Sequence, residues 1–276
     1  MTLPPMQLTE INGVKLDTLD RGSGEPIVFV HGSMGDESFA VLEESVLTSS
    51  YRLIHYHRRG WGRSELPDTP VSISQGASDC IALLQHLGIE RTHLVGQSHG
   101  GVICLQTALD APELVHSLAL LEPALPSVLL NSPELRATLE KALALYGSGD
   151  KAGATDAFGR EVGGADYRAE FDRNLPPGNF DRWVADADTN FQSDAPALQQ
   201  WTFTREDAAR ISQPVLNMRG ANTTSYFQEI HETLQSWLPQ AENFVLPNAN
   251  HCMLQINPSG AAERLASFFS SHRMPE

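Results

Sequence analysis

The chain has 276 residues, of which 41% are hydrophobic and 19% are charged, as is usual for a globular protein with a full core. Its net charge of −15 would repel phosphate backbones and anionic membrane surfaces, so we expect neither nucleic acid nor lipid headgroups as partners. The length fits one large domain or one domain with an insertion. No segment is apolar for long enough to span a bilayer.

The amino terminus and the cysteines indicate the cellular compartment. The first seven residues carry no basic region and no long apolar run, so the sequence predicts no secretion signal. Cys80, Cys104 and Cys252 are odd in number and lack the spacing of zinc ligands. This usage favours free, packed thiols in a reducing compartment. We therefore expect a cytoplasmic protein without a metal or another cofactor.

The amino-terminal part of the chain predicts strands. Residues 6–21 alternate in polarity and are interrupted by Asn12-Gly13, so we expect a hairpin there. Residues 27–30 are apolar throughout, which is typical of a strand that is buried on both faces. Residues 52–56 form the next expected strand. Each of the last two strands is followed by a loop that contains glycine.

Helices and strands then alternate. Apolar residues at helical spacing predict a helix over 73–87, which Gly88 ends. The stretch 92–103 begins as a strand and continues as a helix to about residue 110, and residues 117–121 form another expected buried strand. Such alternation implies a parallel sheet that is covered by helices on both faces.

Residues 124–205 interrupt this alternation. They contain only helical stretches, around 133–146, 151–161, 165–174, 180–190 and 195–202, and many aromatic side chains. We interpret the segment as an inserted helical lid, which divides the chain into a first core part (1–123), the lid (124–205) and a second core part (206–276). The second core part contains expected strands at 214–220 and 243–246, a helix from about residue 226 to 238 and a closing helix at 259–271.

The strand-to-helix transition at Ser98 carries the clearest functional motif. Gly96, Ser98 and Gly100 form the Gly-x-Ser-x-Gly pattern of a nucleophile elbow, in which a serine occupies a sharp, strained turn. The two glycines have no Cβ that could clash in such a turn. The serine hydroxyl would project beyond the sheet above a helix amino terminus, which favours developing negative charge. The motif predicts that Ser98 is a nucleophile.

The motifs together resemble those of the α/β-hydrolase superfamily over essentially the whole chain. The matching segments are His31-Gly32, Arg59 to Ser64, Gly96 to Gly101, and His251 after the last strand. The resemblance implies a mostly parallel eight-stranded sheet with helices on both faces and an inserted helical lid. It does not fix the reaction, because this fold carries many chemistries.

The resemblance also implies roles for individual residues. His251 would be the base that takes the Ser98 proton and later delivers it to the leaving group. The oxyanion hole would use the N–H of His99 and a second N–H from the loop after residue 30, for which the resemblance favours Ser33 over Met34. His57 stands where similar loops often carry aspartate, and we expect a structural role for it.

The third member of the triad departs from the common pattern. The family usually carries an aspartate after the strand at 214–220, but the chain has Asn222 at about that place and no carboxylate nearby. Haloalkane dehalogenases and some lactone hydrolases carry the acid one strand earlier, where Glu122 stands here. We favour Glu122 over Asn222, because a carboxylate stabilises the imidazolium whereas an amide only orients the ring.

These residues favour a serine hydrolase that cleaves an ester, lactone or thioester through an acyl-enzyme. Cleavage of a carbon–carbon bond beside a carbonyl is an alternative, as is a non-catalytic ligand-binding relative. Haloalkane dehalogenases and epoxide hydrolases are disfavoured, because they use aspartate at the position of Ser98. The expected partner is a small, largely apolar or aromatic substrate. The residues expected to contact it are Met34, Trp183, Phe191 and Trp201.

Overall fold

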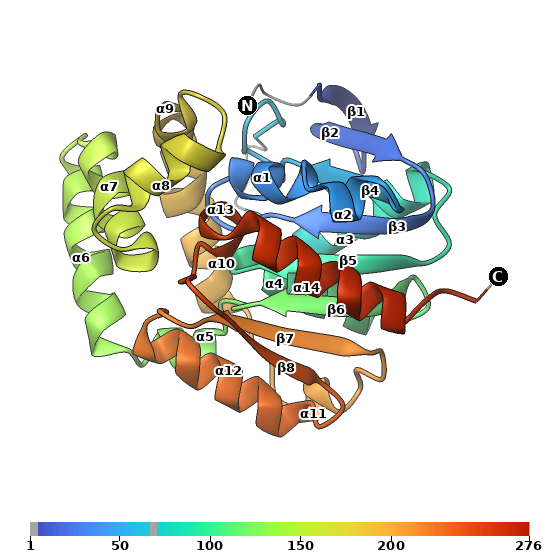
Figure 1. Ribbon diagram of the computed structural model, residues 1–276. Coiled ribbons are helices and arrows are strands. Elements are labelled where there is room, and N and C mark those ends of the chain that lie inside the picture. The colour runs from blue at the N-terminus through green and yellow to red at the C-terminus, as the bar shows by residue number, and fades with distance from the viewer. Residues whose placement is uncertain (1–4, 67–70, 276) are drawn as a thin grey trace.

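The computed structural model describes residues 5–66 and 71–275. Residues 1–4, on which the expectation of no secretion signal partly rests, lie outside the described residues. The strands form a single eight-stranded sheet in the order β1-β2-β4-β3-β5-β6-β7-β8 (Figure 1). They are β1 (Gln7–Ile11), β2 (Val14–Gly22), β3 (Glu25–Val30), β4 (Tyr51–Tyr56), β5 (Thr92–Gln97), β6 (Val115–Leu121), β7 (Val215–Gly220) and β8 (Glu242–Leu246).

The sheet is antiparallel at one edge and parallel elsewhere. The β1–β2 and β2–β4 pairs are antiparallel, and all pairs from β4 onward through β3 to β8 are parallel. Asn12 and Gly13 both have positive φ, 50° and 76°, which suits the tight β1–β2 hairpin and confirms its prediction. The strand bounds agree with the expected ones to within two residues.

Helices cover both faces of the sheet. In Figure 1, α1, α2 and α14 lie in front of the strands and α3 and α4 lie behind them. The helices of the core are α1 (Phe39–Leu42), α2 (Ser45–Thr48), α3 (Ile73–His86), α4 (His99–Asp110), α11 (Arg205–Ala208), α12 (Ser225–Trp237), α13 (Met253–Ile256) and α14 (Pro258–Ser271), with a short 3₁₀ helix η1 (Asp36–Ser38). This arrangement confirms the expected α/β architecture.

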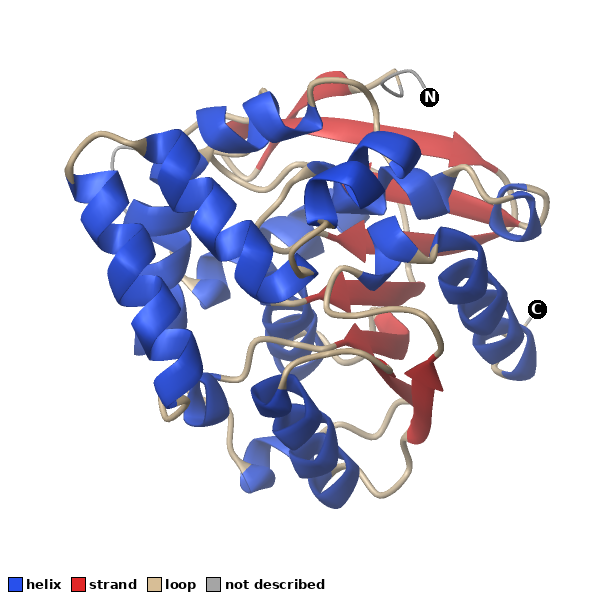
Figure 2. Cartoon of the chain, turned by 60° about the vertical axis from the view of Figure 1, so that its left-hand side comes forward, coloured by secondary structure: helices blue, strands red, loops and turns tan. Residues whose placement is uncertain are grey.

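A helical segment separates β6 from β7. It comprises α5 (Pro126–Leu129), α6 (Pro133–Gly147), α7 (Lys151–Gly163), α8 (Tyr167–Asn174), α9 (Asn179–Ala185), the π-helix η2 (Thr189–Asp194) and α10 (Ala195–Gln200). We call residues 124–205, which contain these helices, the helical insertion. Figures 1 and 2 show α6 to α9 beyond the ends toward which the parallel strands point.

The expected helical stretch at 180–190 is observed with one irregularity. Helix α9 ends at Ala185, Asp186 is a turn residue, and residues 187–188 are helical again before η2 begins at Thr189. The side chain of Asp186 accepts the Gly62 N–H, and the Thr189 hydroxyl donates to the Gly60 carbonyl. These two hydrogen bonds join the segment to the core loop at the irregularity.

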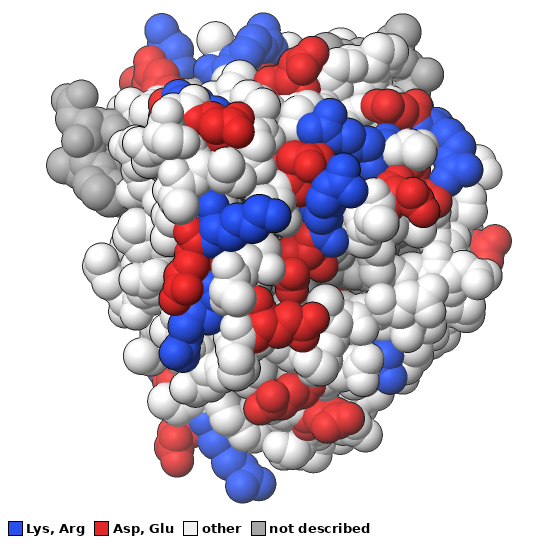
Figure 3. Space-filling model, turned by 90° about the vertical axis from the view of Figure 1, so that its left-hand side faces the viewer, with Lys and Arg blue, Asp and Glu red and all other residues white. Residues whose placement is uncertain are grey.

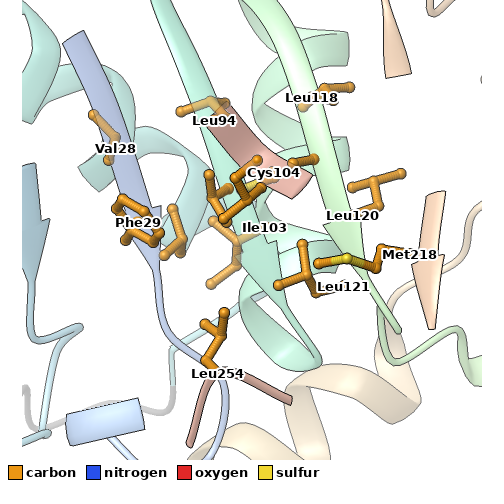
Figure 4. Close-up of a cluster of buried hydrophobic side chains, with 14 of the residues drawn as sticks. Val28, Phe29, Leu94, Ile103, Cys104, Leu118, Leu120, Leu121, Met218 and Leu254 are labelled. Atoms are coloured by element: carbon orange, nitrogen blue, oxygen red, sulfur yellow. The ribbon is translucent and has the colours of Figure 1, made fainter. Parts of the chain in front are cut away.

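The core lies between the central strands and their covering helices. Figure 4 shows apolar side chains of β3, β5, β6 and β7 meeting side chains of α4 and α13. The labelled residues are Val28, Phe29, Leu94, Ile103, Cys104, Leu118, Leu120, Leu121, Met218 and Leu254. The three cysteines are free and buried, as expected from their reading as packing residues. Burial of this apolar surface fixes the strand ends from which the site is built.

Within the described residues, no helix has the length and apolar character needed to cross a membrane.

Candidate active site

Ser98 occupies a strained turn between β5 and α4. Its φ of 53° and ψ of −120° are rare for a residue with a side chain. A Cβ at Gly96 would lie 2.6 Å from the Gly100 carbonyl oxygen, and a Cβ at Gly100 would lie 1.9 Å from the Val30 carbonyl oxygen. Only glycine therefore fits at both positions, and the chain can turn sharply enough to present Ser98 at the end of the sheet.

The strand register brings Ser98 beside Glu122. Gln97 of β5 pairs with Leu121 of β6, so the residues that follow each strand are neighbours. The Ser98 N–H donates to the Leu121 carbonyl over 3.1 Å. Glu122 has a positive φ of 46° and is 1% exposed. A buried carboxylate in such a conformation requires partners, because burying an uncompensated charge is costly.

The Glu122 carboxylate has three hydrogen-bond partners among the described residues. Its Oε2 lies 2.7 Å from Nδ1 of His251 and also accepts the Thr223 hydroxyl over 2.9 Å. Its Oε1 accepts the Gly220 N–H over 2.8 Å. With Nδ1 donating to the carboxylate, Nε2 of His251 is the nitrogen left to act as a base. The structure therefore brings together the two residues that sequence reasoning paired as base and acid.

The imidazole of His251 is held from other sides as well. The Phe227 ring stacks on it with 3.8 Å between ring centroids and 7° between ring planes. The Gln97 side chain donates to the His251 carbonyl over 2.6 Å. Ser98 and His251 line the same cavity, without a hydrogen bond between their side chains in the described part of the chain. Such bonds often form only once substrate is bound.

Asn222, the alternative orienting residue, lies elsewhere. Its side chain is exposed, and its N–H donates to the Ala249 carbonyl over 2.8 Å. It borders a separate surface depression with Gly164 and Asn250. Among the described residues, the side-chain hydrogen bond of His251 is thus to Glu122 and not to Asn222.

The loop His31–Gly35 follows β3 and faces the elbow; we call it the 31–35 loop. His31 is buried, its Nε2 accepts the Arg58 N–H over 2.9 Å, and its Nδ1 lies 2.8 Å from the Gly32 carbonyl. Burial, with the nearby Arg58 charge, lowers the pKa of His31 well below its usual value. A neutral His31 protonated on Nδ1 satisfies both contacts, which agrees with its expected bracing role.

The two candidate residues for the second oxyanion donor lie on opposite sides of this loop. Ser33 lines the same cavity as Ser98 and His251. Met34 borders a different hollow with Asp36 and His57, and its sulfur lies 3.9 Å from the Gln255 amide nitrogen. The Met34 side chain is thus not among those lining the cavity. This placement favours Ser33 as the donor.

The cavity at Ser98 has a volume of about 110 Å³ and is enclosed mainly by apolar side chains of the helical insertion. The polar lining residues besides Ser33, Ser98 and His251 are Asn190, Asp194, Gln199 and Tyr226. The apolar lining residues are Ala124, Pro126, Leu129, Leu130, Leu135, Leu139, Phe158, Val162, Phe191, Ala195, Leu198 and Phe227. Around the insertion the protein surface carries acidic and basic side chains interspersed with uncharged areas (Figure 3).

One of the three expected aromatic contacts lines this cavity. Phe191 lines the cavity, and the centroid of its ring lies 4.9 Å from that of the Tyr146 ring. Trp183 instead packs against Phe158, Tyr167 and Phe180. Trp201 stacks on Phe203 and donates to the Gln106 side chain over 2.8 Å. Neither tryptophan is among the lining residues, because Trp183 packs against aromatic side chains of the insertion and Trp201 packs against Phe203 and α4.

His57 and His99, two further histidines near the site, both lie beside carboxylates. The ring of His57 lies between Asp17 (3.6 Å) and Asp36 (3.3 Å). Burial disfavours its charged form, but the two carboxylates outweigh this effect and raise the pKa of His57 to about 9. The His99 ring is buried 3.8 Å from Asp194, and burial lowers its pKa to about 4. These surroundings agree with the expectation that His57 is structural.

Sequence reasoning did not find Phe227, Arg58 or Asp194. Phe227 stacks on His251, while Arg58 pairs with Asp194, 136 residues away, beside the cavity. A lone aromatic residue on a helix and an ion pair between distant segments leave no local pattern in the sequence. Within the described ranges, no group of three or more His, Cys, Asp and Glu side chains is arranged to hold a metal ion.

The sequence model of the alpha/beta hydrolase fold family matches residues 25–258, which include Ser98, Glu122 and His251. The chain belongs to the α/β hydrolase fold family. Membership of this family does not fix the reaction, because one fold carries many chemistries.

The chain is also similar to curated relatives and to solved structures. Over 118 residues the chain is 30% identical to the dihydrolipoyllysine-residue acetyltransferase component of the acetoin cleaving system of Cupriavidus necator, covering 42% of this chain and 32% of that protein. The chain thus spans about a third of the curated relatives that it matches.

Two solved structures are similar over nearly the whole chain. The enol-lactonase from Burkholderia xenovorans LB400 is 21% identical with a TM-score of 0.80, and the alignment covers 96% of this chain and 100% of that one. Carboxylesterase CesB from Bacillus subtilis is 19% identical with a TM-score of 0.77, covering 97% and 92%. At this identity the likeness shows the shared fold.

Proposed function

We propose that this α/β hydrolase is a serine hydrolase that cleaves carboxylic ester or lactone bonds through an acyl-enzyme. Ser98 is the nucleophile, His251 the base and Glu122 the acid. The observation that carries the proposal is the 2.7 Å bond between Glu122 and His251, formed at a strand end adjacent to the strained Ser98 turn. The lactonase and carboxylesterase among the similar structures act on these bond types, which supports the choice of substrate class.

The first half of the reaction forms the acyl-enzyme. His251 Nε2 takes the Ser98 proton as Oγ attacks the substrate carbonyl, and the carbonyl electron pair moves onto oxygen. The N–H groups of His99 and Ser33 stabilise that oxyanion, and Glu122 stabilises the imidazolium. When the carbonyl re-forms, the alkoxide leaves with the proton of His251.

The second half restores the enzyme. Water attacks the acyl carbon and gives one proton to His251, which forms a second tetrahedral intermediate. When this intermediate collapses, Ser98 Oγ leaves and takes that proton back from His251, and the carboxylic acid product is released. For a lactone, the alcohol and the acid remain one molecule.

The lining of the cavity supports a neutral, largely apolar substrate. Leucine and phenylalanine side chains of α5, α6, α7 and η2 line the cavity together with Ser98. We propose that the helical insertion, residues 124–205, acts as a lid that excludes water and selects the substrate. No lysine or arginine is present among the described lining residues. Cleavage of a carbon–carbon bond beside a carbonyl thus has no specific feature in its favour.

The experiment is hydrolysis of a panel of p-nitrophenyl esters and γ- and δ-lactones by the wild type and by Ser98→Ala. We expect turnover of at least one neutral apolar substrate by the wild type and a loss of about 10⁴-fold or more in the variant. If the folded wild type binds these compounds without turnover, it is a ligand-binding relative. Full activity in Ser98→Ala would contradict the mechanism.

A further inference from the structure

Arg58 lies where the 31–35 loop meets the helical insertion. Its side chain is buried, and it donates from Nε to the His31 carbonyl over 3.0 Å and from Nη2 to the Gly32 carbonyl over 2.7 Å. The same guanidinium forms two bonds to Asp194, Nη1 to Oδ1 at 3.0 Å and Nη2 to Oδ2 at 2.6 Å. Asp194 ends η2 and lines the cavity at Ser98. One side chain thus joins the loop to the insertion.

The contacts at the Gly32 carbonyl determine the direction of the next N–H. That carbonyl faces both Arg58 Nη2 and His31 Nδ1. In a trans peptide the C=O and the following N–H point in opposite directions, and no described peptide bond is cis. The Ser33 N–H therefore points away from Arg58. This N–H is the second donor that the proposed reaction requires.

The charge of Asp194 gives Arg58 a second role. Burial disfavours the carboxylate form of Asp194, but Arg58 and His99 outweigh this effect and keep the pKa of Asp194 below its ordinary value. Trp61 Nε1 also donates to Oδ2 over 3.2 Å. A carboxylate in the cavity wall would oppose the oxyanion that forms nearby, and the guanidinium offsets its charge.

We propose that Arg58 is a positioning residue that aims the Ser33 N–H at the oxyanion, and that Asp194 couples this alignment to the seating of the helical insertion. The proposal rests on the function proposed above. Because Arg58 touches only the backbone of the loop, its loss should weaken transition-state stabilisation and leave ground-state binding nearly unchanged.

The test compares Arg58→Met, Arg58→Lys and Asp194→Asn with the wild type on its best ester. We expect kcat to fall by about 10- to 100-fold in Arg58→Met with KM within about threefold, a smaller loss than that caused by deleting an oxyanion donor outright. Arg58→Lys restores the charge but cannot hold two carbonyls and a carboxylate, so it should remain at least about fivefold below the wild type. Asp194→Asn should lose about 3- to 10-fold.

Arg59→Met is the matched control. Arg59 is the residue after Arg58 and forms a partly buried ion pair with Asp79 over 2.6 Å. It also donates to the Asn12 carbonyl, and not to the 31–35 loop. Its loss should lower stability comparably and leave kcat within about twofold. Thermal unfolding and circular dichroism of each variant separate misfolding from misalignment.

A pair of ketone inhibitors tests directly whether the Ser33 N–H is aimed at the oxyanion. A trifluoromethyl ketone accepts Ser98 Oγ at its carbonyl, and the electron pair becomes an oxyanion while the proton passes to His251. Arg58→Met should raise its Ki by the factor by which kcat/KM falls and leave the Ki of the matching methyl ketone unchanged. Equal effects on both ketones, full rescue by Arg58→Lys, or unchanged kcat in Arg58→Met or Asp194→Asn would overturn the proposal. Absence of wild-type turnover would overturn the proposed function instead.

Discussion

At the scale of single residues, Glu122 is the most informative. One of its oxygens bonds His251 and the other bonds the Gly220 N–H, so its position is set by both the histidine loop and the end of β7. An amide at residue 122 could keep the backbone contact but would carry no negative charge. The imidazolium that forms in the reaction would then lose its stabilising partner.

We therefore expect Glu122→Gln to lower kcat by roughly 10⁴-fold, the loss seen when a triad acid becomes an amide. Asn222→Ala should cost about tenfold or less, since the Asn222 side chain is exposed and the His251 ring is bonded to Glu122. Steady-state kinetics of both variants, with thermal unfolding as a check on folding, measure the difference. The reverse order of losses in folded variants would transfer the orienting role to Asn222.

The sequence made Ser98, His251 and Glu122 visible because each follows an apolar strand and belongs to a pattern known from the superfamily. It could not show that Trp183 and Trp201 pack away from the cavity while Phe191 lines it, because the direction of an aromatic ring depends on how helices pack. Arg58 and Asp194 also remained hidden, since charged residues so far apart in the chain become partners only in the folded protein.

At the scale of elements, the helical insertion contributes most of the cavity wall. Phe191 of η2 faces the cavity, and its replacement by a smaller side chain should lengthen the apolar space without altering the strand ends. Trp201 lies near the end of the same segment but faces Phe203.

Phe191→Leu should therefore raise the ratio of kcat/KM for octanoate to that for acetate p-nitrophenyl esters by about fivefold or more, since each methylene is worth about 1 kcal/mol or more in an apolar pocket. Trp201→Phe, the matched control, should leave the ratio within about twofold. A ratio that changes only in Trp201→Phe would show that the wrong face of the insertion has been assigned to substrate.

The His57 cluster joins several elements by charge. Its ring lies between Asp17 of β2 and Asp36 of η1, and Asp36 also pairs with Arg182 of α9 over 2.6 Å. The folded-state pKa of His57, about 9, exceeds the ordinary value of 6.5. Its stabilising contribution is therefore complete below pH 6.5 and is lost as the pH rises through about 9.

We expect the wild type to exceed His57→Asn in free energy of unfolding by a margin that is larger at pH 6 than at pH 10. The pKa difference corresponds to a change of about 3 kcal/mol in that margin. Urea unfolding of both proteins at pH 6, 7.5, 9 and 10 provides the measurement. A margin that stays constant or grows with pH would show that His57 is not held in its charged form.

At the scale of the whole molecule, the order of apolar strands and helices was enough to predict the doubly covered sheet. Strands such as β3 and β5 are apolar because helices cover both faces, so their sequence reports their burial directly. The helices of the helical insertion were also predictable, since α6, α7, α8 and α10 lie close to the expected helical stretches. The π-helix η2 was not, and contacts such as those of Asp186 and Thr189 with the core loop form only in the folded protein.

The whole fold presents Ser98 as an activated nucleophile in the proposed function. Labelling with an alkyl fluorophosphonate, followed by mass spectrometry of the intact protein and its peptides, is the sharpest test of this role. We predict one adduct per chain, located at Ser98, slower labelling in Glu122→Gln, and none in Ser98→Ala. An adduct on another residue, or equal labelling of the wild type and Ser98→Ala, would contradict the account.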